Sequence, residues 1–284
     1  MIQSMTGYGK INKILTDKKI TVEIKSLNSK NLDMNTRIPS VYREKDIEIR
    51  KTLAKNLMRG KIEFSIYVEN TGENASAVIN KNIVSGYLEQ LKELNVESED
   101  LLSIAMRLPD VLKAEREELD EEEWKQVNEM ILEAVEKLQE FRKDEGEALK
   151  EDFILRLDNI QMMLDKILEI DKERLDAVRE KLLKAIGEIE VNYDENRFEQ
   201  ELLYYLEKLD ITEEKVRLGN HLDYFKKELG SEVSNGKKLA FISQEIGREI
   251  NTIGSKANYA PMQKLVVQMK DDLEKIKEQL LNIL

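Results

Sequence analysis

The sequence contains no cysteine among its 284 residues, and it has only three prolines, one tryptophan and one histidine. Without thiols there are no disulfides, thiolate zinc sites or cysteine nucleophiles, so any metal must be held by oxygen and nitrogen ligands. No stretch approaches 18 uninterrupted apolar residues, and the first residues lack a basic region followed by an apolar one. We therefore expect a cytoplasmic protein that is neither exported nor inserted into a membrane.

Several common catalytic motifs are also missing. The sequence has no P-loop, no nucleophile elbow, no His-Glu-x-x-His zinc motif and no kinase motif set. The pair Gly7 and Gly9 lacks the third glycine of a dinucleotide-binding turn. These absences argue against the nucleotide-binding and hydrolase classes that the motifs define.

Charge is distributed unevenly along the chain, although the net charge is -12. Residues 1–70 contain 14 lysines and arginines against 8 aspartates and glutamates, whereas the remainder carries a net charge of -18. The first segment is suited to contact phosphate, and the acidic middle is not. An excess of this size also fits an ordinary solvated surface.

The apolar pattern predicts an α+β fold. Residues 20–27 and 61–69 alternate with a period of two, as half-buried strands do, and residues 41–58 between them have helical spacing. From residue 83 onward the pattern is helical almost throughout. We expect a small N-terminal α/β sheet domain (1–80), a middle region of long amphipathic helices (81–192) and a C-terminal helical region (193–284), with a linker at 192–196.

Two helical patterns predict buried stripes. In residues 121–190 a helical hairpin or coiled coil is the natural packing, with apolar residues at Phe153, Leu157, Ile160, Leu164, Ile167 and Leu168. The second pattern, in residues 241–256, has a stripe of Phe241, Ile242, Ile246, Ile250 and Ile253. This stripe leaves the polar face of the second helix directed outward or into a cleft.

Polar residues of unusual kinds share faces of two C-terminal helical patterns. Glu214, Arg217 and the only histidine, His221, fall on one stripe, because seven residues return to within about 20° of the starting direction. In the other pattern the shared face holds Glu245, Arg248 and Glu249, flanked by Gln244 and Asn251. Taken alone, each residue suits an ordinary structural role, but their clustering favours a site.

Two kinds of chemistry fit these residues. Carboxylates with an imidazole suit Mg²⁺ or Mn²⁺, for which His221, Glu214 and Glu245 are the candidate ligands. The cations Arg217, Arg248 and Lys256 would then contact phosphate oxygens. Alternatively, His221 acts as a general acid or base, as in ribonucleolytic cleavage through the 2′-hydroxyl.

The basic N-terminal segment contains a second candidate surface. It mixes aromatic, amide and basic side chains as single-stranded RNA surfaces do, with Tyr8, Lys25, Asn28, Lys30, Arg37 and Lys61 as the residues concerned.

Several separated motifs resemble the YicC/YloC endoribonuclease family, in order and along essentially the whole chain. In the first half these are Ser4-Met5-Thr6-Gly7-Tyr8-Gly9, residues 23–30, Arg59-Gly60-Lys61, Arg107-Leu108-Pro109 and Glu145-Gly146. In the second half they are residues 210–221 and 244–256.

The resemblance implies a bacterial cytoplasmic endoribonuclease that depends on a divalent metal, Mn²⁺ or Mg²⁺, and acts on single-stranded RNA as a homohexamer around a cavity for RNA. It also implies that His221, Glu214, Glu245 and Glu249 are the metal or catalytic candidates. We add Arg248 to the catalytic candidates. The residues expected to orient RNA are Arg217, Gln244, Arg248, Asn251 and Lys256.

The sequence departs from the family pattern at three positions. Ala240 and Tyr259 stand where the family has acids, and Asn220 stands where serine is common. The two lost carboxylates leave an alternative open: an oligomeric RNA-binding adaptor that cuts nothing and presents RNA to a separate exoribonuclease. A purely structural helical scaffold would explain the acidic middle but not the polar residues of 244–256.

Overall fold

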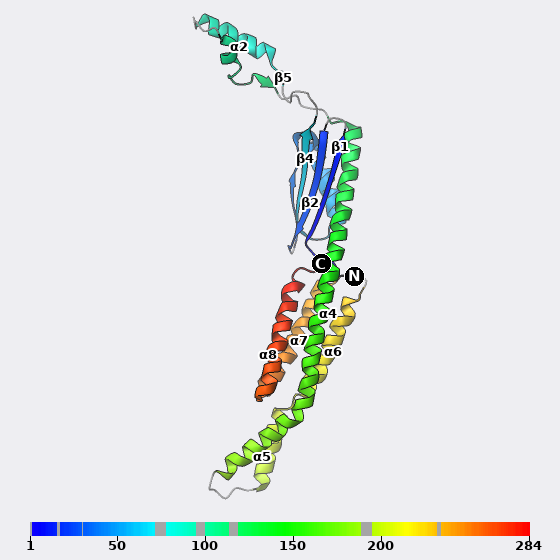
Figure 1. Ribbon diagram of the computed structural model, residues 1–284, viewed down its shortest axis with the longest axis vertical. Helices are drawn as coiled ribbons and strands as arrows, with labels where there is room; N and C mark the ends of the chain where they lie inside the picture. Colours follow the sequence, from blue (N-terminus) through cyan, green and yellow to red (C-terminus); the bar gives the residue numbers. More distant parts are fainter. Residues whose placement is uncertain are drawn as a thin grey trace.

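The molecule is long and narrow in the computed structural model (Figure 1). The structure describes residues 2–15, 18–29, 31–71, 78–94, 100–113, 119–188, 195–231 and 234–284. A β-sheet lies toward one end, a bundle of helices lies toward the other, and one long helix, α4 (Glu121–Gly187), runs beside both. The predicted α+β fold class is confirmed.

The sheet contains four strands, β1 (Gly7–Leu15), β2 (Lys18–Leu27), β3 (Leu32–Arg37) and β4 (Gly60–Asn70). Their order is β1-β2-β4-β3; β3 is parallel to β4, and the other neighbours are antiparallel. The strands predicted at 20–27 and 61–69 are confirmed within β2 and β4. The sequence patterns did not reveal β1 and β3.

The described helices that pack on the sheet cover one of its faces. The alternating residues of β2 and β4 put Val22 and Phe64 into a core that also contains Leu53 of α1 (Asp46–Asn56) and Val127 of α4. A 3-10 helix, η1 (Ser40–Lys45), precedes α1, so the helix predicted over 41–58 is divided in two. Because α1, η1 and α4 share this face, the opposite face of the sheet is left open.

A small lobe follows β4. It consists of β5 (Val78–Ile79), α2 (Lys81–Glu93), α3 (Leu101–Ala105) and β6 (Leu112–Lys113). Its core contains three buried residues, Val84, Ala105 and Val111, and it lies beyond the end of the sheet in Figure 1.

The helix α4 is one continuous helix of 67 residues, so the expected hairpin within residues 121–190 is wrong. At a rise of about 1.5 Å per residue it is about 100 Å long. Its first half packs on the sheet and its second half packs in the helical bundle. Five of its six predicted core residues are buried, and Leu168 is exposed.

The bundle is formed by the second half of α4 with α6 (Thr212–Leu229), α7 (Gly236–Lys256) and α8 (Ala260–Leu280). The helix α5 (Glu195–Lys208) lies beside the far end of α4 (Figure 1). In α7 the predicted stripe is buried except for Phe241, which is 62% exposed. None of the described helices combines the length and apolar character that crossing a bilayer requires.

The two ends of the chain meet between the sheet and the bundle, which we call the junction (residues 2–6 and 281–284). Ser4 and Ile283 form a β-bridge, and the Met5 N–H donates to the Asn282 carbonyl at 2.7 Å. Arg142 of α4 lies buried here and donates to the carbonyls of Met5 and Arg59. Burial lowers the pKa of Arg142 to about 10, because the charged form loses water contacts. The junction therefore fastens both halves to α4.

Candidate functional site

The helices α6 and α7 lie side by side and run in opposite directions, so the start of α6 lies beside the end of α7. Asp210 accepts hydrogen bonds from the N–H and the hydroxyl of Thr212 at the start of α6. These bonds, the hydroxyl first, lower the pKa of Asp210 below its usual value. At the start of α7 the Asn235 side chain accepts from the Lys238 N–H at 3.2 Å. Asn235 therefore caps α7, whereas α6 begins with the Asp210–Thr212 hydrogen bonds just before its first turn.

A buried ion pair joins the two helices where α6 starts. Glu214 is only 7% exposed, and its Oε1 accepts from Lys256 Nζ at 2.8 Å. The same ammonium group donates to the Asp210 carbonyl at 2.8 Å. The second carboxylate oxygen, Oε2, is buried and has no hydrogen-bond partner among the described residues. A buried carboxylate oxygen without a partner is costly, so it marks a candidate functional group.

The relative positions of two other candidates, His221 and Glu249, follow from the register of the two helices. His221 lies seven residues after Glu214 along α6, and Glu249 lies seven residues before Lys256 along α7. Because both helices rise about 1.5 Å per residue, His221 and Glu249 lie at one level, about 10 Å along from the ion pair. His221 is half-buried and Glu249 is 4% exposed. Neither side chain has a hydrogen bond or ion pair within the described part of the chain.

The remaining candidates of these helices lie at the surface. Arg217 pairs with Glu213 on the same helix, and Arg248 is 72% exposed, at 3.9 Å from Glu245. Gln244 and Asn251 are exposed. These four side chains are exposed to solvent.

The structure does not bring the proposed metal ligands together in one chain. Within the described ranges no three histidine, aspartate or glutamate side chains form a group that could hold a metal ion. Binding of a metal by His221, Glu214 and Glu245 stays a prediction, and it would require ligands beyond these side chains.

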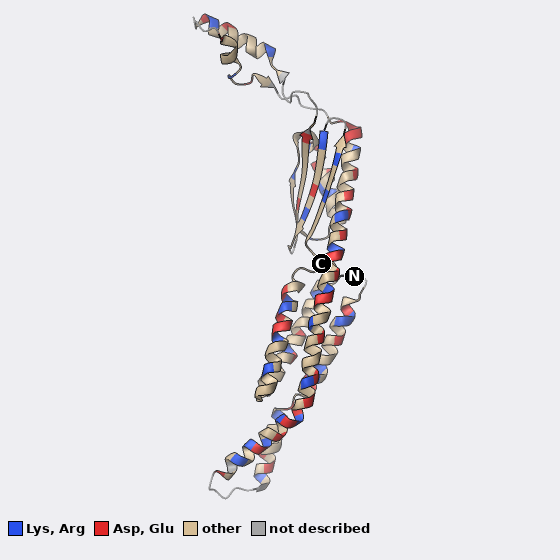
Figure 2. Ribbon diagram, viewed as in Figure 1, with Lys and Arg blue, Asp and Glu red and all other residues tan. Residues whose placement is uncertain are grey.

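Four of the N-terminal candidates, Tyr8, Lys25, Arg37 and Lys61, lie on strands of the sheet. The sheet is separated from most of the helix pair along the length of the molecule (Figure 1). Lys25 pairs with Glu23 at 2.7 Å, which raises the Lys25 pKa through a hydrogen bond, and its ammonium lies over the Tyr8 ring. Lys61 pairs with Glu63 at 3.6 Å, and Arg37 lines a small hollow of about 90 Å³. Figure 2 shows both charge signs on these strands. The basic excess predicted from composition is thus partly neutralised locally.

The roles of two further N-terminal candidates, Asn28 and Lys30, stay predictions. Asn28 donates from its side chain to the Leu281 carbonyl at 2.8 Å, so its amide contributes to the junction. Lys30 lies outside the described residues.

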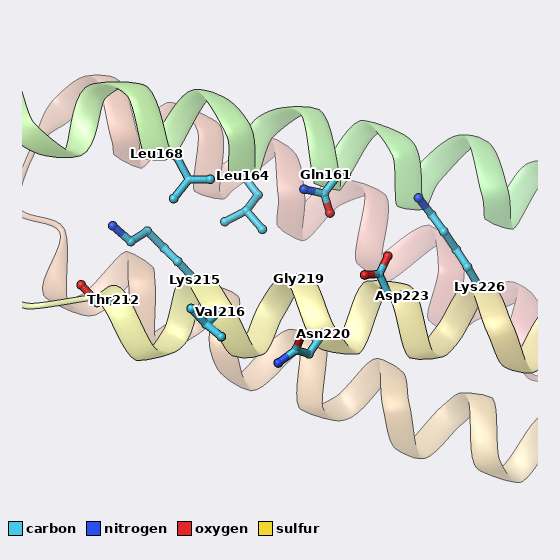
Figure 3. A pocket seen from close by; sticks show the side chains of 10 residues that line it. All are labelled: Gln161, Leu164, Leu168, Thr212, Lys215, Val216, Gly219, Asn220, Asp223 and Lys226. Atoms are coloured by element: carbon cyan, nitrogen blue, oxygen red, sulfur yellow. The ribbon is translucent and has the colours of Figure 1, made fainter.

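A larger groove, of about 580 Å³, runs between α4 and α6 (Figure 3). Leu164 and Leu168 of α4 form one wall, and Val216 and Gly219 of α6 form the other. None of the predicted catalytic or RNA-binding side chains lines it. The groove is therefore separate from the candidate site.

One buried ionic cluster was not expected from the sequence. Asp171 of α4 accepts from Arg174 at 2.8 Å and from Lys215 of α6 at 2.6 Å. Both Nη atoms of Arg174 are buried without a partner in the described residues. The sequence gives no signal for this cluster, because each member looks like an ordinary charge on a solvated helix. The cluster ties α6 to α4 beside the Glu214–Lys256 pair.

The two positions that lack a family acid, Ala240 and Tyr259, lie near opposite ends of α7. Ala240 is one turn from the start of α7, and Glu249 is nine residues further, about 13 Å along the helix. Tyr259 follows the end of α7, three residues after Lys256. Tyr259 is therefore closer than Ala240 to the Glu214–Lys256 ion pair.

The fold and the helix pair define a two-part α+β protein with acid–base side chains on facing helices. Residues 2–151 match the family model "Endoribonuclease YicC-like, N-terminal region", and residues 167–284 match "Endoribonuclease YicC-like, C-terminal". The chain therefore belongs to the YicC-like endoribonuclease family, as its motifs predicted.

Two relatives are similar along their full lengths. The probable endoribonuclease YicC of Clostridioides difficile (strain 630) is 33% identical over 293 residues, with 100% of both chains covered. The probable endoribonuclease YicC of Haemophilus influenzae (strain ATCC 51907 / DSM 11121 / KW20 / Rd) is 31% identical over 291 residues, again with 100% of both covered.

Proposed function

We propose that this protein is an endoribonuclease that cuts phosphodiester bonds within single-stranded RNA. Membership of the family supports the activity, and the helix pair of α6 and α7 supports its location. The main support for this location is Glu214. Its Oε2 is buried without a partner among the described residues, and the residue shares a stripe of α6 with His221. Carboxylates and imidazole are the side chains that most often transfer protons in catalysis.

Each candidate has a role that follows from its position. His221 and Glu249, at one level of the helix pair, would move the proton of the attacking or leaving oxygen. Arg217 and Arg248 at the surface would contact phosphate oxygens, since guanidinium groups bind them through two parallel hydrogen bonds. The exposed Gln244 and Asn251 would orient the neighbouring nucleotides.

We propose Mn²⁺ or Mg²⁺ as the cofactor. The predicted ligands His221, Glu214 and Glu245 do not come together within the described part of one chain, and Glu214 is the best supported of the three. The free Oε2 of Glu214 is an oxygen donor of the kind these ions take. The small number of protein ligands still fits, because Mg²⁺ usually keeps several waters and binds through one or two carboxylates together with substrate phosphates. When bound, the ion would neutralise charge on the phosphate undergoing cleavage.

The open face of the sheet would bind RNA away from the helix pair. Lys25, Arg37 and Lys61 offer cations, and Tyr8 offers an exposed ring on which a base can stack. We also propose a cytoplasmic homohexamer, for which the family resemblance is the support. Light scattering of the purified protein would give its mass, and a monomer mass would contradict the hexamer.

The test is cleavage of an end-labelled single-stranded RNA by the wild-type protein and by His221→Ala, each with Mn²⁺, Mg²⁺ or EDTA. We expect internal cuts that require the metal and fall at least about 100-fold in His221→Ala. The matched control is Asn220→Ala, an exposed neighbour on the same helix that should keep the wild-type rate. Circular dichroism would check that both variants fold.

The ends of the products distinguish two nucleophiles. Attack by the 2′-hydroxyl leaves a 2′,3′-cyclic phosphate, whereas attack by water leaves a plain phosphate monoester.

The alternative is an oligomeric adaptor that binds RNA without cutting it and passes it to a separate exoribonuclease. The lack of a three-ligand group among the described residues and the missing acids at Ala240 and Tyr259 favour it. RNA binding without products under every metal condition would support the adaptor and contradict the nuclease.

A further inference from the structure

Lys256 lies where α7 ends, and its hydrogen bonds differ from those of a lysine that binds phosphate. Its Nζ donates to Glu214 Oε1 and to the Asp210 carbonyl, both at 2.8 Å. An ammonium group has three N–H donors, so two are already used within the protein. Its side chain is also only partly exposed.

Glu214 needs this partner more than a surface acid would. Its carboxylate is buried, and an uncompensated buried charge is strongly unfavourable. Lys256 compensates the charge and holds Oε1, whereas Oε2 has no hydrogen-bond partner among the described residues. By contrast, Arg217 pairs on the surface with the exposed Glu213 and does not reach into the bundle in this way.

We propose that Lys256 is a positioning residue for Glu214 and not a ligand of the RNA backbone. It holds the catalytic carboxylate across the two helices, so that Oε2 keeps one orientation toward the reacting groups. This proposal rests on the proposed function, in which Glu214 takes part in RNA cleavage. It replaces the expectation from sequence that Lys256 orients RNA.

The test compares Lys256→Met and Lys256→Arg with the wild type in cleavage and in RNA binding at several salt concentrations. We expect Lys256→Met to lower kcat about 10- to 100-fold, as loss of groups that orient active residues does. KM and the salt dependence of binding should stay close to wild type. Lys256→Arg should recover much of kcat, because arginine can also pair with a carboxylate.

The matched control is Lys237→Met, which removes an exposed lysine from the other end of the same helix. It should leave kcat and KM unchanged. If Lys256 binds phosphate instead, Lys256→Met will weaken RNA binding and reduce the salt slope by about 0.7, with kcat retained. That result would overturn the proposal.

A double variant distinguishes this proposal from the proposed function. Adding Lys256→Met to Glu214→Gln should slow cleavage no further, because the lysine acts through the carboxylate. If the wild type cuts no RNA, the proposed function fails. The pairing is then tested by urea unfolding: Lys256→Met should lower the midpoint in the wild type more than in Glu214→Gln. Equal shifts would show that the two side chains are not coupled and would overturn the positioning role.

Discussion

The junction and the α6–α7 pair both contain the motifs that identify the family, yet their polar groups are used differently. At the junction, side chains donate to backbone carbonyls, as Ser26 does to Met5 at 2.7 Å and Asn28 does to Leu281. In the helix pair, Glu214 keeps a buried oxygen without a partner among the described residues, and His221 and Glu249 bond to none of them. Family motifs thus form structural contacts at the junction and a candidate site in the α6–α7 pair. The two regions differ in whether these polar groups have hydrogen-bond partners among the described residues.

The largest effect on folding is expected at the junction from Gly146→Ala. A Cβ at Gly146 of α4 would lie 2.3 Å from the Ile2 carbonyl oxygen, so the backbone would have to shift. We expect a loss of about 1–3 kcal/mol in the free energy of unfolding, measured with urea.

The control for this change is Gly86→Ala, also in a helix, where an added Cβ meets nothing within 4 Å. It should not destabilise the protein. Because alanine has a higher helix propensity than glycine, it should stabilise α2 by about 0.5–1 kcal/mol. Equal stability of Gly146→Ala and wild type would contradict the close contact at the junction.

A smaller effect is expected on the open face of the sheet. Replacing Lys25, Arg37 and Lys61 by methionine should weaken single-stranded RNA binding and lower the salt slope by about 0.7 for each lost phosphate contact. The ion pairs of Lys25 and Lys61 do not prevent this, because exposed pairs contribute little and exchange readily.

The matched control removes the same charge from α4, where Lys125, Lys166 and Lys172 are exposed. Replacing these three by methionine should leave the slope nearly unchanged. Equal changes in both triple variants would mean that only net charge matters and that the sheet face is not a binding surface.

Sequence patterns predicted the parts of the fold where periodicity is strong. The alternation in β2 and β4 and the apolar spacing in α4 and α7 predicted the fold class correctly, and most residues of the predicted α4 and α7 stripes are buried. The strand β1 was missed because Gly7 and Gly9 interrupt its apolar pattern. An added Cβ at Gly9 would lie 2.0 Å from the Ala134 carbonyl oxygen, so this glycine lets α4 approach the strand closely.

Features that depend on distant partners could not be predicted. The spacing in residues 121–190 fits both a hairpin and one long helix, and only tertiary packing selects the latter. The site residues on α6 and α7 were chosen by their stripes, but burial of Glu214 and its pairing with Lys256 depend on how the two helices pack. Nothing in the pattern separates Phe241, at the exposed edge of its stripe, from the buried isoleucines. The domain boundaries at 81 and 193 stay predictions.

We expect the buried carboxylate of Glu214 in the α6–α7 pair to take part in RNA cleavage. Two adjacent glutamates allow a direct test, because Glu213 is exposed and Glu214 is buried. Cleavage of single-stranded RNA should be measured for Glu213→Gln and Glu214→Gln, with folding checked by circular dichroism. We expect Glu214→Gln to lose at least about 100-fold in rate while Glu213→Gln stays within about twofold of wild type. A folded Glu214→Gln variant that cuts RNA at the wild-type rate would show that the Glu214 carboxylate takes no part in cleavage.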